Sequence, residues 1–148
     1  MASPSPSPSP DPTSVASDVA DKIQELGLGT LGTDLFIGSM PDEKDVKNCV
    51  CVYDVGGINP TRFYDRSIPE WRNDQFQITT RNRSYAAAMI KAFKISEALD
   101  QIGNWDTDYW NYLSLFKLTE PRSIGRQEGT DLQLVTHEWD SRRNKIGE

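Results

Sequence analysis

Residues 74–102 predict a strand that leads directly into a long helix, and this stretch decides most of the expected architecture. From Asp74 to Arg81, apolar or β-branched side chains alternate with polar ones, which is typical of a strand with one buried face. Ser84 is suited to cap a helix and Gly103 to end it. Apolar side chains recur between them at helical spacing: Tyr85, Ala88, Met89, Ala92, Phe93, Leu99 and Ile102. We therefore expect a helix that packs on a sheet in a small α+β domain.

Periodicity and turn residues predict the other elements. A first helix is expected from Ser14 to Leu26, with Gly27 ending it. Further strands are expected over residues 34–37, 49–55, 110–118 and 131–139. The order is then α-β-β-β-α-β-β, which predicts an α+β fold with a mostly antiparallel or mixed five-stranded sheet and two helices packed on it.

The two ends of the chain differ in composition from the middle. Residues 1–12, MASPSPSPSPDP, are expected to form an extended tail, because alternating proline favours a polyproline-type backbone. Residues 13–140 are expected to form a single α+β domain, and residues 141–148 a C-terminal surface tail. The chain length of 148 residues suits one domain.

Charge and hydropathy exclude several classes of function. The formal net charge of −6 argues against nonspecific DNA binding, because such binding needs a positive surface that attracts phosphate. The N-terminus lacks the basic and apolar regions of a signal peptide. No apolar run approaches the ~20 residues that span a bilayer, so we expect no membrane partner.

Four motifs raise the possibility of chemistry, and each has a simpler structural explanation. Cys49 and Cys51 lie on one side of a strand, about 6.6 Å apart, which is too far for a relaxed disulfide. They supply only two of the four ligands that a closed zinc site needs. The Gly27–Gly32 match to GxGxxG follows a helix and precedes a strand, the reverse of a dinucleotide site. His137 shares a face with core residues, and Asp106 and Asp108 are expected to cap a turn. We therefore predict no catalytic residue, no cofactor and no metal.

The connection over residues 56–73 is long and has no clear period, which favours a functional or interface loop. Arginine, tyrosine and tryptophan are enriched at the energetic centres of protein interfaces. The predicted subunit or partner contacts are Arg62, Phe63, Tyr64, Arg66 and Trp71.

Five segments, in this order, resemble the minor capsid and tail terminator proteins of long-tailed bacteriophages: Gly38–Asp42 (Gly-x-x-Pro-Asp), Val52–Gly57 (VYDVGG), Phe76–Arg81 (FQITTR), Tyr85–Ala88 (YAAA) and Pro121–Gly129 (Pro-x-x-Ile-Gly-Arg-x-Glu-Gly). The resemblance covers about residues 33–139. It implies a virion protein of the phage neck, assembled in the host cytoplasm, that forms a hexameric ring, caps the tail tube and joins it to the head–tail connector. The implied partners are further copies of the chain, the tail tube protein and the connector or stopper protein. Viral DNA would pass through the lumen without sequence-specific binding.

Two other functions remain open from the sequence. One is a small hydrolase that uses His137 together with an acid. The other is an adaptor domain whose proline-rich tail is a ligand for aromatic-lined grooves. A mass of about six subunits in solution would favour the assembly protein over both.

Overall fold

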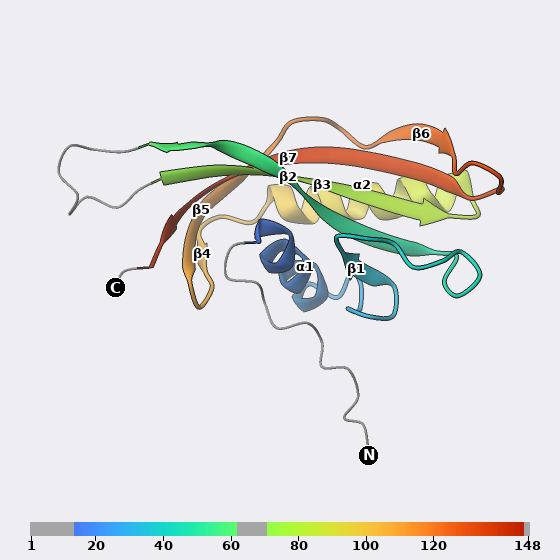
Figure 1. The fold of residues 1–148 in the computed structure, drawn as a ribbon, viewed down its shortest axis with the longest axis horizontal. Helices are drawn as coiled ribbons and strands as arrows, with labels where there is room; N and C mark the ends of the chain where they lie inside the picture. The colour runs from blue at the N-terminus through green and yellow to red at the C-terminus, as the bar shows by residue number, and fades with distance from the viewer. Residues whose placement is uncertain (1–13, 62–70, 147–148) are drawn as a thin grey trace, which may run out of the picture.

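The structure is a computed structural model, which describes residues 14–61 and 71–146. Two helices lie on one face of a single curved sheet (Figure 1). The elements in chain order are α1 (Val15–Glu25), β1 (Leu35–Ile37), β2 (Cys49–Thr61), β3 (Trp71–Asn82), α2 (Tyr85–Asp100), β4 (Trp105–Asp106), β5 (Trp110–Lys117), β6 (Arg122–Arg126) and β7 (Gln133–Lys145).

The sheet has seven strands in the order β1-β2-β3-β7-β5-β4, and β6 pairs with β7 beside this path. β1 runs parallel to β2, while the other pairs are antiparallel. β3 and β7 form the centre, and their pairing extends from Trp71 opposite Asn144 to Asn82 opposite Gln133. The sheet is therefore mixed, with β5 and β6 sharing the far edge of β7.

The predicted five-stranded sheet is wrong in its strand count. The two extra strands are β4, which has only two residues, and β6, in which every residue is exposed. β4 is too short and β6 too exposed to produce the alternation of apolar and polar side chains on which the prediction depended. Backbone pairing to β5 and β7 holds them in place.

Strand ends also differ from the prediction because pairing continues where the apolar pattern stops. β2 extends to Thr61 and β3 begins at Trp71, so residues 56–61 and 71–73 of the expected connection belong to two paired strands. β7 continues beyond Trp139 to Lys145, alongside both β3 and β5. Here polar residues such as Arg143 occupy the inner face, and a hydrophobic pattern does not mark them as part of a strand.

The predicted helices are confirmed. The Ser14 side chain caps α1 by accepting a hydrogen bond from the Ser17 N–H, and Ser84 caps α2 in the same way through Ala87. Both helices bury an apolar stripe against the sheet. The main core cluster joins residues from both helices to β1, β2, β3, β5 and β7, and its largest fully buried members are Trp139, Tyr112 and Phe76. A smaller cluster of Ala88, Ala92 and Val135 lies under the first half of α2.

Candidate assembly surfaces

The predicted interface loop falls largely outside the described residues. Arg62, Phe63, Tyr64 and Arg66 are not described, and Trp71 is described only as the first residue of β3. The structure does show where the loop is anchored. The ends of β2 and β3 extend past the helices as a two-stranded arm, defined here as residues 56–61 and 71–75 (left in Figure 1).

A buried ionic network lies at the base of this arm. The Arg143 side chain is 1% exposed, and its Nη2 and Nε atoms lie 2.7 and 2.9 Å from Asp74 Oδ2. Its Nη1 donates to the Tyr112 hydroxyl at 3.1 Å, and the guanidinium lies 3.9 Å from the centre of the Trp110 ring. The Tyr112 hydroxyl in turn donates to Asp18 at 2.5 Å. Burial raises the pKa of Asp18, which the Tyr112 hydrogen bond and the Arg143 charge oppose.

The same region fixes the start of α1. The Ser14 hydroxyl donates to Asp54 Oδ2 at 2.6 Å, and the Ala16 N–H donates to Asp54 Oδ1 at 3.0 Å. Asp54 lies on β2, so a carboxylate of the sheet satisfies backbone and side-chain donors at the helix N-terminus. With the Arg143 network, this contact ties α1 to β2, β3, β5 and β7. The arm therefore projects from a rigid base.

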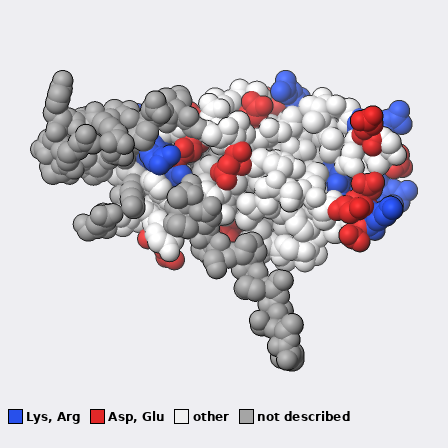
Figure 2. Space-filling view, viewed as in Figure 1, with Lys and Arg blue, Asp and Glu red and all other residues white. Residues whose placement is uncertain are grey.

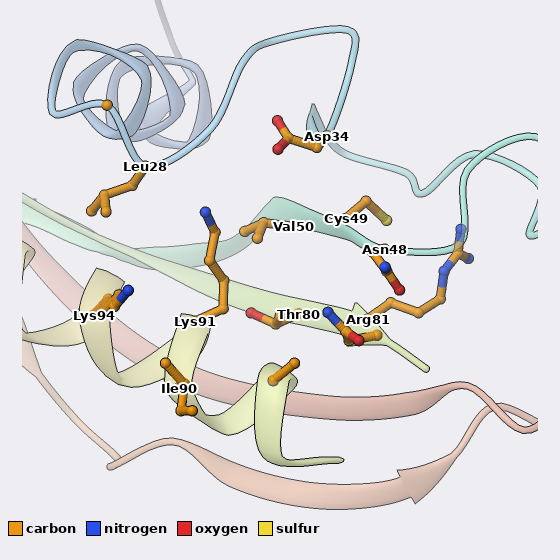
Figure 3. A pocket seen from close by; sticks show the side chains of 13 residues that line it. Leu28, Asp34, Asn48, Cys49, Val50, Thr80, Arg81, Ile90, Lys91 and Lys94 are labelled. Atoms are coloured by element: carbon orange, nitrogen blue, oxygen red, sulfur yellow. The ribbon is translucent and has the colours of Figure 1, made fainter. Parts of the chain in front are cut away.

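A groove lies between the C-terminal end of α1 and the first half of α2 (Figure 3). Its volume is about 480 Å³, and Val50 and Thr80 of the sheet are among the residues that line it. Leu28 and Ile90 add apolar surface, and α2 contributes Lys91 and Lys94. No pattern along the sequence indicates this groove, because its walls come from segments far apart in the chain.

Mixed charges gather at the end of the molecule that carries the β1–β2 loop and the β6–β7 turn (right in Figure 2). Arg81 organises this end: its guanidinium donates to the carbonyl oxygens of Pro41 at 2.8 Å and Val46 at 2.5 Å, and to Gln127 Oε1 at 3.2 Å. Gln127 also donates to Glu43 at 3.0 Å. A buried arginine thus holds the β1–β2 loop, whose Asp42 and Asp45 are exposed at the surface.

His137 is buried in the core of the sheet. The Trp139 Nε1–H donates to His137 Nδ1 at 2.7 Å, and the histidine side chain is 0% exposed. Burial lowers the pKa of His137 to about 4, and the nearby Lys117 charge adds to the effect. The imidazole is therefore neutral at pH 7 and serves as a hydrogen-bond acceptor inside the core.

This burial predicts a pH dependence of stability. Because the pKa of His137 is about 4 when folded and about 6.5 when unfolded, the unfolded state binds the extra proton between these values. The free energy of unfolding should fall as the pH drops from 6.5 to 4, by up to about 3 kcal/mol. Denaturant unfolding at a series of pH values measures this. A His137→Gln variant, which keeps an acceptor for Trp139, should show a flatter profile over this range, and an unchanged slope would contradict the assignment.

The remaining sequence motifs have structural roles. Cys49 and Cys51 are both free and buried, and burial raises the pKa of the Cys51 thiol to about 11. Gly27, at a φ of 77°, follows α1 and leads toward β1.

The prediction that Asp106 and Asp108 cap a turn is wrong: Thr107 Oγ1, rather than an aspartate, accepts hydrogen bonds from the N–H groups of Tyr109 and Trp110. Within residues 14–61 and 71–146, no three His, Cys, Asp or Glu side chains lie together as a metal site would require.

A solved structure described as "Virion of native gene transfer agent (GTA) particle" contains a chain of similar fold, with a TM-score of 0.55 and 17% sequence identity, covering 76% of this chain and 80% of the other. At this identity the likeness concerns the fold. No curated protein matches the sequence. No helix in the described residues has the length and hydropathy to cross a membrane.

A family profile described as "Bacteriophage tail terminator protein" matches residues 22–130, which is well over half of the chain. The family consists of structural proteins of the phage tail and not of enzymes, so the hydrolase alternative with His137 is excluded. The resemblance noted in the sequence is confirmed. The chain belongs to the bacteriophage tail terminator family and is a structural protein of the tail and neck of the virion.

Proposed function

We propose that this protein forms a hexameric ring that caps the tail tube and joins it to the head–tail connector. Membership of the tail terminator family supports the capping role. The structural observation that best supports the ring is that the sheet of each subunit has two open edges. β1 covers β2 only from Val50 to Val52, and β6 is exposed along its whole length on the other side.

Open edges favour assembly because unpaired N–H and C=O groups accept a further strand. The two edges belong to different strands, so a contact between them is head-to-tail rather than two-fold symmetric. Repeated head-to-tail contacts form a closed ring when the rotation between subunits closes. An acidic subunit, with a formal net charge of −6, also suits a lumen through which DNA passes without being held.

The ring is tested by the mass of the purified protein, measured by light scattering or native mass spectrometry, alone and after addition of purified tail tubes. We expect a species of six subunits in solution or bound at the tube end, and tubes that stop growing once it binds. A protein that stays monomeric in both conditions and leaves tube growth unchanged would contradict the proposal.

We also propose that the tip of the arm makes contacts between subunits or with the tube. Replacing Tyr64 or Trp71 with alanine should weaken association by about 2 kcal/mol if either is an energetic centre of the interface. Alanine at Arg62, Phe63, Tyr64, Arg66 and Trp71 together should abolish ring formation and head–tail joining in a complementation assay. Lys44→Ala, on the exposed β1–β2 loop, is the control and should leave both unchanged. Normal rings and joined virions from the five-fold variant would place the interface on the sheet edges instead.

A further inference from the structure

The groove between α1 and α2 contains polar groups that lack partners. The Thr80 side chain is 1% exposed, and its hydroxyl oxygen has no hydrogen-bond partner among the described residues. A buried hydroxyl without a partner is destabilising and uncommon in native proteins. The Lys91 and Lys94 ammonium groups also form no ion pair within the part of the chain that the structure describes. The groove is thus prepared for a ligand that carries negative charge and hydrogen-bonding atoms.

The outer surface of α2 is unusually apolar for a helix at a molecular surface. Tyr85 is 52% exposed, Ile90 57% and Phe93 39%. The opposite side of the helix is buried in the core through residues such as Ala92, Ile95 and Leu99. A helix that is apolar on both sides is usually covered on both sides. Ile90 also lines the groove, so the exposed apolar surface of α2 reaches the two lysines there.

The same chain offers a complementary surface at its β4–β5 turn. Asp106 and Asp108 are exposed there, and Tyr109 is 47% exposed. The turn is held in one conformation, since Thr107 Oγ1 accepts from two backbone N–H groups and the Tyr109 carbonyl accepts from the Ile146 N–H at 2.8 Å. A turn that is already ordered loses little conformational entropy when it binds.

We propose that the β4–β5 turn of one copy docks in the α1–α2 groove of the next copy, an inference that rests on the ring proposed above. The Asp106 and Asp108 carboxylates pair with Lys91 and Lys94, and the Tyr109 ring packs against Ile90 and Leu28. The Thr80 hydroxyl gains a partner from the entering polar groups. Asp34 is the one carboxylate among the residues that line the groove, whereas Arg81, Lys91 and Lys94 all line it, so positive charge dominates there.

The positions of the two surfaces fit a ring. The β4–β5 turn lies beside the α1 face that includes Asp21, Lys22 and Glu25, whereas the groove lies beside Gly27 and Leu28 and the first half of α2. In Figure 1 the turn is to the left of α1 and the first half of α2 to its right. Two different surfaces that complement each other give a head-to-tail contact, and one copy can use both at once.

Charge reversal tests the docking. Lys91→Glu with Lys94→Glu, and separately Asp106→Lys with Asp108→Lys, should each raise the protein concentration needed for half-maximal ring formation at least tenfold. The variant with all four changes should recover most of the lost ring formation, because the two surfaces again carry opposite charges. Lys44→Glu, an exposed lysine on the β1–β2 loop, is the control and should change ring formation less than twofold. Circular dichroism and melting temperatures confirm that each variant is folded.

Thr80→Val gives an independent test of the groove. If docking supplies the hydroxyl with a partner, valine should weaken ring formation while leaving the stability of the monomer equal or higher. If both charge-reversed variants form rings at the same protein concentration as the wild type, the proposed docking is wrong and the ring proposal stands. A wild-type protein that forms no ring, with or without tubes, would overturn the ring and the docking together.

Discussion

Replacing Arg143 with methionine should lower the free energy of unfolding by about 3–5 kcal/mol. The guanidinium is 1% exposed, and its nitrogens lie 2.7 Å from Asp74 Oδ2 and 3.9 Å from Asp18 Oδ2. Methionine fills a similar volume but leaves buried carboxylates without this positive charge. The cost is mainly that of an uncompensated charge, because solvation by water is no longer available to these carboxylates.

Denaturant unfolding of wild type and variant at pH 7 measures the loss. Arg126→Met is the matched control, since Arg126 is exposed on β6, and it should change stability by less than about 0.5 kcal/mol. Lowering the pH distinguishes charge from packing. Burial already raises the pKa of Asp18, and removing Arg143 should raise it further. The folded variant then takes up a proton more readily than the unfolded chain, so its deficit should shrink toward pH 4. A deficit that is independent of pH would indicate lost packing instead.

Replacing Trp139 with alanine should cost about 3–5 kcal/mol. Trp139 is 0% exposed in the centre of the core, and its ring stacks on Phe76 with 6.2 Å between ring centroids. The substitution removes the largest fully buried side chain and leaves a cavity that the surrounding strands cannot close. Its indole N–H is also the donor to His137.

Trp139→Phe separates these contributions. It keeps most of the apolar contact but deletes the donor, so we expect a smaller loss of about 1–3 kcal/mol. The control is Phe116→Ala, at an aromatic side chain that is 48% exposed on β5, which should cost less than about 1 kcal/mol. Equal losses for Phe116→Ala and Trp139→Ala, measured by chemical unfolding, would contradict the assignment of the core.

These two predictions concern the same part of the molecule as the proposed assembly. Arg143 and Trp139 lie on β7, which pairs with β3 along the whole length of β3. β3 forms one side of the arm, and β5, which also pairs with β7, follows the β4–β5 turn. Loss of the buried network should therefore weaken ring formation as well as stability, whereas the charge reversals at the groove should affect the ring alone.

The family and the main elements were accessible from the sequence because they depend on local patterns. The alternation from Asp74 to Arg81 and the helical spacing after Ser84 follow from backbone periodicities of two and 3.6 residues. Both are found in the structure, as β3 and as α2 with Ser84 as its cap. Gly27 and Ser14 are likewise local signals for the ends of α1, and the ordered motifs of residues 38–129 indicated a tail terminator.

Local patterns along the chain therefore predict the two helices, the central strands and the family. The seven-stranded sheet arises from tertiary pairing, because β4 has only two residues and β6 is exposed throughout, and both exist through pairing with β5 and β7. Only the tertiary structure decided the Arg143 network, whose Asp18–Tyr112 and Arg143–Asp74 contacts join residues 94 and 69 positions apart. The α1–α2 groove has the same origin. Such contacts depend on how distant segments pack, and no periodicity along the chain encodes them.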